Sequence, residues 1–151
     1  MSRTHISSPA DLLNLTGGLL GVSPWHEISQ ERVDMFAEAT GDRQWIHVDA
    51  VRAAAGPFGG PIAHGYLTLA LAPIFISEVL VVEQLEAALN YGLNKVRFPT
   101  PVPVGSRVRG AIALKSADAR PTGVEAVFTV VYELENSQRP ACVAEFVALY
   151  R

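Results

Sequence analysis

A carboxylate and an imidazole stand close together in the middle of this chain. Asp42 follows a glycine at the end of a predicted helix, and His47 lies five residues further on. A loop carboxylate beside an imidazole can hold a water molecule, because the carboxylate accepts a proton from it while the histidine orients it or handles a second transfer. Such positioned groups each raise a rate by about 10²–10⁴. The pair therefore predicts acid–base chemistry on water.

Gly65 is a third candidate, because it begins a predicted apolar helix. Its N–H would lie in the first turn, where backbone donors have no partner within the helix and the dipole favours negative charge. Such a donor can stabilise a carbonyl oxygen that becomes negative during a reaction, and a residue without a side chain lets a ligand approach. Base, imidazole and oxyanion donor together suit addition of water to a double bond conjugated to a carbonyl.

Helix caps and apolar spacing predict the elements that position these residues. Ser29 is the N-cap of a helix through Ala39 that Gly41 ends, and Asp49 caps a short helix over residues 50–55. Ser8 and Pro9 open another helix, within an N-terminal helical extension that we place at residues 1–24.

An apolar segment follows Gly65, and we expect one long helix from there to about Val82. It is apolar all round, which indicates a helix buried at the centre of the fold. Its longest uncharged stretch, residues 65–77, is thirteen residues. A membrane span needs about 20, so we predict neither a membrane helix nor, from the polar N-terminus, a signal peptide.

The second half of the chain has a period of two, which predicts strands. One face of the clearest strand is formed by Val124, Ala126, Phe128, Val130, Tyr132 and Leu134. Similar runs occupy residues 89–98, 106–116 and 141–150, and short turns between them predict an antiparallel meander. Helices followed by such a sheet give the α+β class, with the sheet wrapped around the central apolar helix.

Composition limits the class of protein. A chain of 151 residues is one domain, and its net charge of −3 argues against a nucleic-acid binder. Cys142, the single cysteine, stands in a predicted core strand as a small buried hydrophobe, so a reducing, cytoplasmic setting is expected.

Three histidines other than His47 are given structural interpretations. We expect His64 to be satisfied by a backbone group near the helix start, and His5 and His26 to lie on the surface. Asp42, His47 and His64 together would imitate a metal site of two histidines and one carboxylate. Because no compact ligand motif surrounds them, we predict no metal.

Three segments resemble a known family: Phe-Ala-Glu-Ala-Thr-Gly-Asp-Arg-Gln-Trp-Ile-His-Val-Asp at 36–49, Ile-Ala-His-Gly at 62–65 and Phe-Pro-Thr-Pro-Val-Pro-Val-Gly at 98–105. They look like the MaoC-like, (R)-specific enoyl-CoA hydratases, which have the hotdog fold. The resemblance implies that Asp42 and His47 act on a water, that the Gly65 N–H binds the thioester carbonyl, and that two protomers pair their sheets. It implies no cofactor beyond the CoA, or acyl carrier protein, of the substrate.

The chain departs from this family at two places. Gln44 and Trp45 stand where members usually have Asn-Pro; the Gln44 amide can still hydrogen-bond the water or His47. Pro73 stands where some members have a hydroxyl that holds the aspartate, so Asp42 must be oriented otherwise, with Thr68 as one candidate.

Four basic residues lie on the strands around the proline-rich turn: Lys95, Arg97, Arg107 and Arg109. Their spacing is typical of the solvated face of a strand, but one or two could meet the phosphates of CoA; Lys95 and Arg97 are the pair we name. The expected function is (R)-specific hydration of trans-2-enoyl-CoA in fatty-acid metabolism by a homodimer. A hotdog thioesterase and a non-catalytic acyl-thioester-binding subunit are the alternatives.

Overall fold

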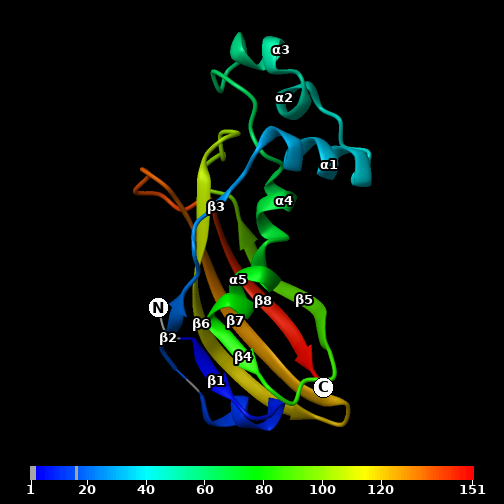
Figure 1. The fold of residues 1–151 in the computed structure, drawn as a ribbon, viewed down its shortest axis with the longest axis vertical. Coiled ribbons are helices and arrows are strands. Elements are labelled where there is room, and N and C mark those ends of the chain that lie inside the picture. Colours follow the sequence, from blue (N-terminus) through cyan, green and yellow to red (C-terminus); the bar gives the residue numbers. More distant parts are fainter. Residues whose placement is uncertain (1–2, 16) are drawn as a thin grey trace.

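A computed structural model describes residues 3–15 and 17–151, which form short helices and one large antiparallel sheet. The elements in chain order are β1 (Thr4–Ile6), the 3-10 helix η1 (Pro9–Asn14), β2 (Leu19–Val22), β3 (His26–Glu27), α1 (Gln30–Thr40), α2 (Trp45–Val48), α3 (Ala50–Ala54), α4 (Gly65–Leu69), α5 (Ala72–Val79), β4 (Leu80–Val82), β5 (Ala88–Arg97), β6 (Arg107–Arg120), β7 (Gly123–Leu134) and β8 (Cys142–Tyr150). In Figure 1, α1 to α3 stand at one end of the sheet, while β1 and η1 lie at the other.

The large sheet has the order β2-β6-β7-β8-β5, with β3 also paired to β6. The predicted strands and their antiparallel pairing are confirmed, but the simple meander is wrong, because β5 pairs with β8 and not with β6. The segment after β5 makes no tight turn. It pairs with the loop before α4, where Ala63 N–H donates to the Val102 carbonyl (2.8 Å) and Val104 N–H to that of Pro61 (2.9 Å).

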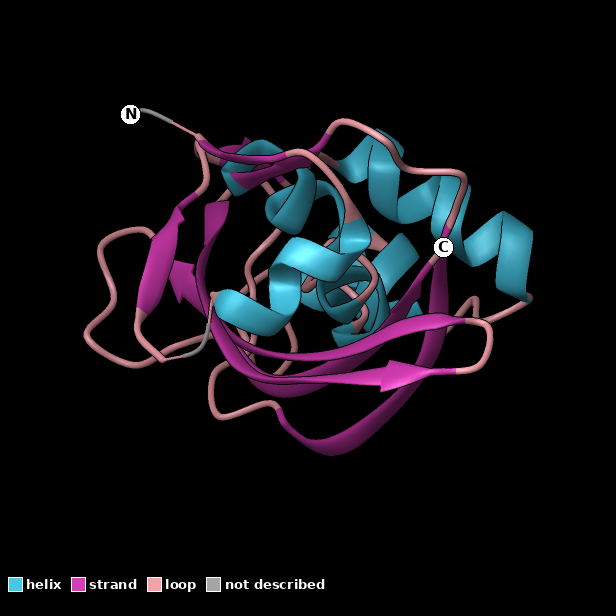
Figure 2. Ribbon diagram, turned by 90° about the horizontal axis from the view of Figure 1, so that it is seen from below, coloured by secondary structure: helices cyan, strands magenta, loops and turns pink. Residues whose placement is uncertain are grey.

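The sheet curves around α4 and α5, which lie against its concave side (Figure 1 and Figure 2). The predicted inner face of β7 is buried at each position from Val124 to Leu134. Phe75 of α5 is fully buried and sits directly over Gly110 of β6, where a Cβ atom would lie 2.6 Å from the Phe75 ring. The glycine therefore lets the helix approach the sheet.

The prediction of one long helix from Gly65 to about Val82 is wrong. α4 ends at Leu69, α5 begins at Ala72, and the chain leaves the helix at Leu80 to form β4, which pairs in parallel with β1. Pro73 explains the break, since it has no N–H to offer the Leu69 carbonyl four residues earlier and its ring crowds that carbonyl. The hydroxyl of fully buried Tyr132 donates to the Leu69 carbonyl instead (2.8 Å).

The predicted helix caps are confirmed. The Ser29 side chain accepts from the Arg32 N–H, Gly41 ends α1 at a φ of 81°, and Asp49 caps α3. The segment 1–24 is only partly the helical extension that we expected, because its described residues also contain two strands. β1 belongs to the small sheet with β4, and β2 belongs to the large sheet, where it pairs with β6.

Two expectations about single residues have different outcomes. Cys142 is fully buried in β8, as predicted, and burial raises the pKa of its thiol to about 12. His5 is exposed, but His26 is not a surface residue: its Nε2 lies 2.9 Å from the Glu78 carboxylate, and its side chain is 21% exposed.

Within the described residues, every helix is too short or too polar to cross a membrane.

Candidate active site

The three residues singled out from the sequence meet at one end of the sheet. Gly41 ends α1, Asp42 follows in the turn, and the chain enters α2, a helix that we did not predict and that carries His47. Gly65 begins α4 beside them. These residues surround a cavity of about 200 Å³ lined by Asp42, His47, His64, Gly65, Tyr66 and Phe98.

Neighbouring groups orient Asp42, whereas the Thr68 hydroxyl makes no hydrogen bond to it. The carboxylate Oδ1 accepts from the Gln44 N–H (3.4 Å), and the Asp42 N–H donates to the Thr40 hydroxyl (3.3 Å). The Asp42 carbonyl accepts from Nε2 of His64 (2.8 Å). The residue itself is exposed, so its carboxylate is accessible to water and to a ligand.

His47 is 6% exposed and fixed in one orientation. Its Nδ1 lies 2.6 Å from the Ile62 carbonyl; because a carbonyl only accepts, Nδ1 carries the proton and Nε2 is the acceptor of the neutral ring. Burial lowers the pKa of His47 below its ordinary value and the neighbouring His64 lowers it further, while the Ile62 hydrogen bond and Asp42 oppose the shift. The ring is therefore held as a neutral hydrogen-bond acceptor.

His64 belongs to the site, which the sequence did not show. A backbone group satisfies it, as predicted, but that group is the Asp42 carbonyl. The ring stacks on His47 with centroids 3.8 Å apart and an interplanar angle of 24°. Its Nδ1 is buried and has no hydrogen-bond partner in the described part of the chain. Its position directly before Gly65 was the available signal.

The cluster also has the composition of a metal site. One ring nitrogen from each histidine and a carboxylate oxygen of Asp42 lie within 4.8 Å of one another. Two imidazoles and one carboxylate can hold a divalent ion, and they can equally hold a water molecule. The sequence argument against a metal stays a prediction, which a chelator tests directly.

A second cavity of about 230 Å³ extends under α4 from the same centre. His47, Gly65 and Phe98 line both cavities. A Cβ at Gly65 would lie 3.2 Å from the Phe98 ring, so the glycine keeps the passage beside its N–H open. Thr68 and Thr100 line the second cavity only.

The two departures from the family pattern leave the cavities unobstructed. Gln44 is exposed, and it contributes its backbone N–H to Asp42. The Trp45 ring packs away from the site, because the guanidinium of Arg52 lies 4.4 Å from its centroid and a Cβ at Gly56 would lie 2.9 Å from it. Pro73 lies in α5.

The four basic residues separate into two pairs. Arg107 is bound to Glu135 (2.7 Å through Nε) and Arg109 to Glu133 (2.6 Å), so their charges are matched within the sheet. Lys95 and Arg97 are exposed and line a third cavity, of about 210 Å³. Arg97 is also the residue directly before Phe98.

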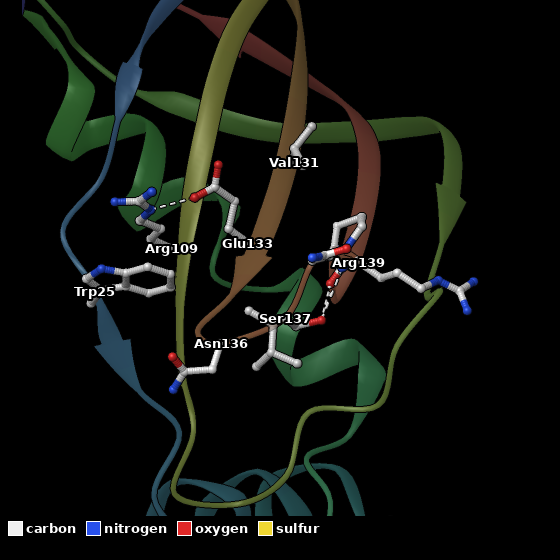
Figure 3. Close-up of a pocket in the computed structure, with 10 residues that line it drawn as sticks. Trp25, Arg109, Val131, Glu133, Asn136, Ser137 and Arg139 are labelled. Carbon is white, nitrogen blue, oxygen red and sulfur yellow. Dashed lines mark hydrogen bonds and ion pairs between the residues drawn. The ribbon is translucent and has the colours of Figure 1, made fainter.

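A larger cavity, of about 560 Å³, lies elsewhere on the sheet (Figure 3). Two of its three charged lining residues are paired with each other, since Arg109 binds Glu133 and also stacks over Trp25, with its guanidinium 4.4 Å from the ring centroid. Asp42 and His47 do not line it. We therefore place the chemistry at the smaller cavities.

Comparison with known proteins shows the family to which this chain belongs. The family described as MaoC like domain matches residues 13–135. The chain belongs to this family. It is 53% identical to 3-hydroxyacyl-thioester dehydratase Z of Mycobacterium tuberculosis over 144 residues, covering 95% of each chain. It is 42% identical to nodulation protein N of Rhizobium meliloti over 148 residues, covering 96% of this chain and 92% of the other.

Solved structures of two (R)-hydratases share the fold. The (R)-hydratase from A. caviae superposes with a TM-score of 0.70 at 22% identity, covering 89% of this chain and 98% of the other. R-hydratase PhaJ1 from Pseudomonas aeruginosa superposes with a TM-score of 0.68 at 24% sequence identity, covering 89% of this chain and 81% of the other. The resemblance seen in the sequence is confirmed: this MaoC-like chain has the hotdog fold and is a dehydratase-type enzyme, a hydro-lyase.

Proposed function

We propose that this MaoC-like enzyme reversibly adds water to trans-2-enoyl-CoA and forms (R)-3-hydroxyacyl-CoA, as part of fatty-acid metabolism. One observation carries the proposal: Asp42, His47 and Gly65, from three different segments, line one cavity. The 53% identity to a 3-hydroxyacyl-thioester dehydratase supports the reaction type.

Each group has a proposed role in this reaction. Asp42 acts as the general base: it takes a proton from water as the water oxygen bonds to C3 of the substrate. The electron pair of the double bond moves toward the thioester carbonyl, whose developing negative charge the Gly65 N–H stabilises. Nε2 of neutral His47 orients the water, and His47 assists return of one proton to C2. One water is consumed and both residues regain their starting protonation states.

Lys95 and Arg97 are proposed to bind the CoA phosphates. They line one cavity, and neither forms an ion pair within the described residues, whereas Arg107 and Arg109 each do. The Phe98 that follows Arg97 lines both active-site cavities. Arg97→Ala should raise KM for a CoA thioester and leave KM for the matching pantetheine thioester, which lacks the nucleotide phosphates, unchanged.

A hydration assay tests the reaction. The purified protein, in buffer containing EDTA, is given a short trans-2-enoyl-CoA; loss of the conjugated absorbance and the configuration of the product are measured. Asp42→Asn and His47→Ala should each reduce kcat by at least about 10². Asp118→Asn and His5→Ala change exposed residues of the same types and should retain the wild-type rate.

Other outcomes would contradict the proposal. Wild-type rates in both site variants would remove the assigned roles, and release of free thiol would indicate a thioesterase. Tight binding of acyl-CoA without water addition would indicate a non-catalytic subunit. A rate that EDTA abolishes and a divalent ion restores would place a metal at the cluster of Asp42, His47 and His64.

A further inference from the structure

Two threonine hydroxyls in the cavity under α4 have no hydrogen-bond partner among the described residues. Thr68, on α4, is 1% exposed, and Thr100 lies in the proline-rich segment after β5. The Oγ1 atoms of both are buried, and both residues line the cavity of about 230 Å³ that His47 and Gly65 also line. A buried hydroxyl without a hydrogen-bond partner is destabilising, so these two are groups for which a ligand can supply the partner.

The position of this cavity relative to the reacting atoms indicates which part of a substrate enters it. Under the proposed function, the thioester carbonyl lies at Gly65 and C3 lies beside Asp42 and His47. The other lining residues, apart from His47, are glycine or apolar, and three of them are buried: Ala63, Val102 and Ala141 are 5%, 4% and 1% exposed. A charged CoA carrier does not suit such walls, whereas an acyl chain beyond C3 does.

We propose that Thr68 and Thr100 form a polar subsite for an oxygen on the acyl chain beyond C3, so that the preferred substrates are enoyl or 3-hydroxyacyl thioesters with a second, chain-borne hydroxyl or keto group. This inference rests on the proposed function, because it uses the placement of C3. A plain alkyl chain that displaces solvent here leaves two buried hydroxyls unpaired, whereas a chain oxygen pairs with them. Sites that hydrogen-bond a substrate oxygen discriminate strongly against the analogue that lacks it.

Competition between matched substrates tests the subsite. The probes are trans-2-hexenoyl-CoA, its analogues with a hydroxyl at carbon 4, 5 or 6, and the 5-oxo analogue. At least one oxygenated probe should exceed the plain chain in kcat/KM by about tenfold or more. Thr68→Val and Thr100→Val keep the shape of the side chain, and each should reverse this preference by lowering kcat/KM for the oxygenated probe while raising it for the plain one.

Two further variants separate the subsite from a structural role. Thr68→Ser retains a hydroxyl and should retain the preference. Thr122→Val, in the exposed turn between β6 and β7, is the matched control and should change neither value. Equal kcat/KM for all probes, or an equal loss for all probes in Thr68→Val, would overturn the subsite while leaving the proposed hydratase intact. No turnover of any probe by the wild-type protein would instead overturn the proposed function.

Discussion

Each of the two imidazoles of the site is held by a backbone carbonyl oxygen, but through a different ring nitrogen. His47 donates from Nδ1 to Ile62, and His64 donates from Nε2 to Asp42. The other nitrogen of each neutral ring is therefore an acceptor, and the Asp42 carboxylate is a third. A water molecule has two hydrogens to donate, so one water satisfies at most two of these three acceptors, and the third remains able to accept a proton. The cluster is thus suited to accept a proton from water and to return it.

This proton balance predicts the dependence of activity on pH. The acceptor role requires neutral His47, whose pKa is lowered by burial and then by His64. Protonation removes the acceptor, so kcat/KM should fall as pH decreases, with the acid limb below about pH 6.5. In His64→Gln, whose amide can still donate to the Asp42 carbonyl, one cause of the lowered pKa is absent, and the acid limb should move to higher pH. If the acid limb in pH–rate profiles of kcat/KM does not move, His64 does not lower the pKa of His47.

At the residue scale, the sequence predicted what lies within one local pattern. Asp42 and His47 are five residues apart, and Gly65 begins a helix, so their types and spacing were informative. The contributions of His64, Phe98 and Thr100 depend on loops that are distant in sequence and that meet only because the segment after β5 pairs with the loop before α4. The spacing of residues along the chain gives no sign of that contact.

At the scale of elements, the break between α4 and α5 sets where the site can lie. Pro73 was visible in the sequence and is sufficient to end a helix before it, yet the apolar pattern continued across it and favoured one helix. The pairing of β5 with β8 was not predictable from local periodicity, because alternation identifies a strand and its faces but not its neighbour. Tertiary contacts decide both features.

Tyr132 is predicted to hold α4 in place through the break. Its hydroxyl is the donor to the Leu69 carbonyl that Pro73 leaves unpaired, and burial raises the pKa of this phenol, so it remains protonated. Tyr132→Phe should lower the free energy of unfolding by about 1–3 kcal/mol and reduce kcat, because Gly65 lies at the other end of α4. Denaturant unfolding measures the first effect. Tyr150→Phe, which removes the same atom from another buried tyrosine, should cost less; equal losses would show that the Leu69 contact is unimportant.

At the scale of the whole molecule, β5 is an edge that a single chain leaves uncovered. It is the last strand of the sheet, and of its ten residues only Val96 is not exposed. Leu89, Tyr91 and Leu93 are 43%, 65% and 44% exposed. A long apolar edge invites pairing with another strand, and a second copy of the same edge gives a closed two-fold dimer. The expected homodimer is therefore proposed to form by antiparallel pairing of two β5 strands.

If the dimer forms through β5, a substitution on this strand should change both the oligomeric state and the activity. By light scattering, the wild-type protein should have twice the 16.2 kDa mass of one chain, and Leu93→Lys should shift it toward a single chain, because a charge on the edge opposes pairing. Leu19→Lys is the matched control, since Leu19 is 66% exposed on the opposite edge strand, β2, which has four residues; it should leave the mass unchanged. Because Phe98 directly follows β5 and lines both cavities, the Leu93→Lys monomer should also lose kcat/KM. A Leu93→Lys protein that stays dimeric, or a wild-type chain that is monomeric and fully active, would remove β5 as the functional interface.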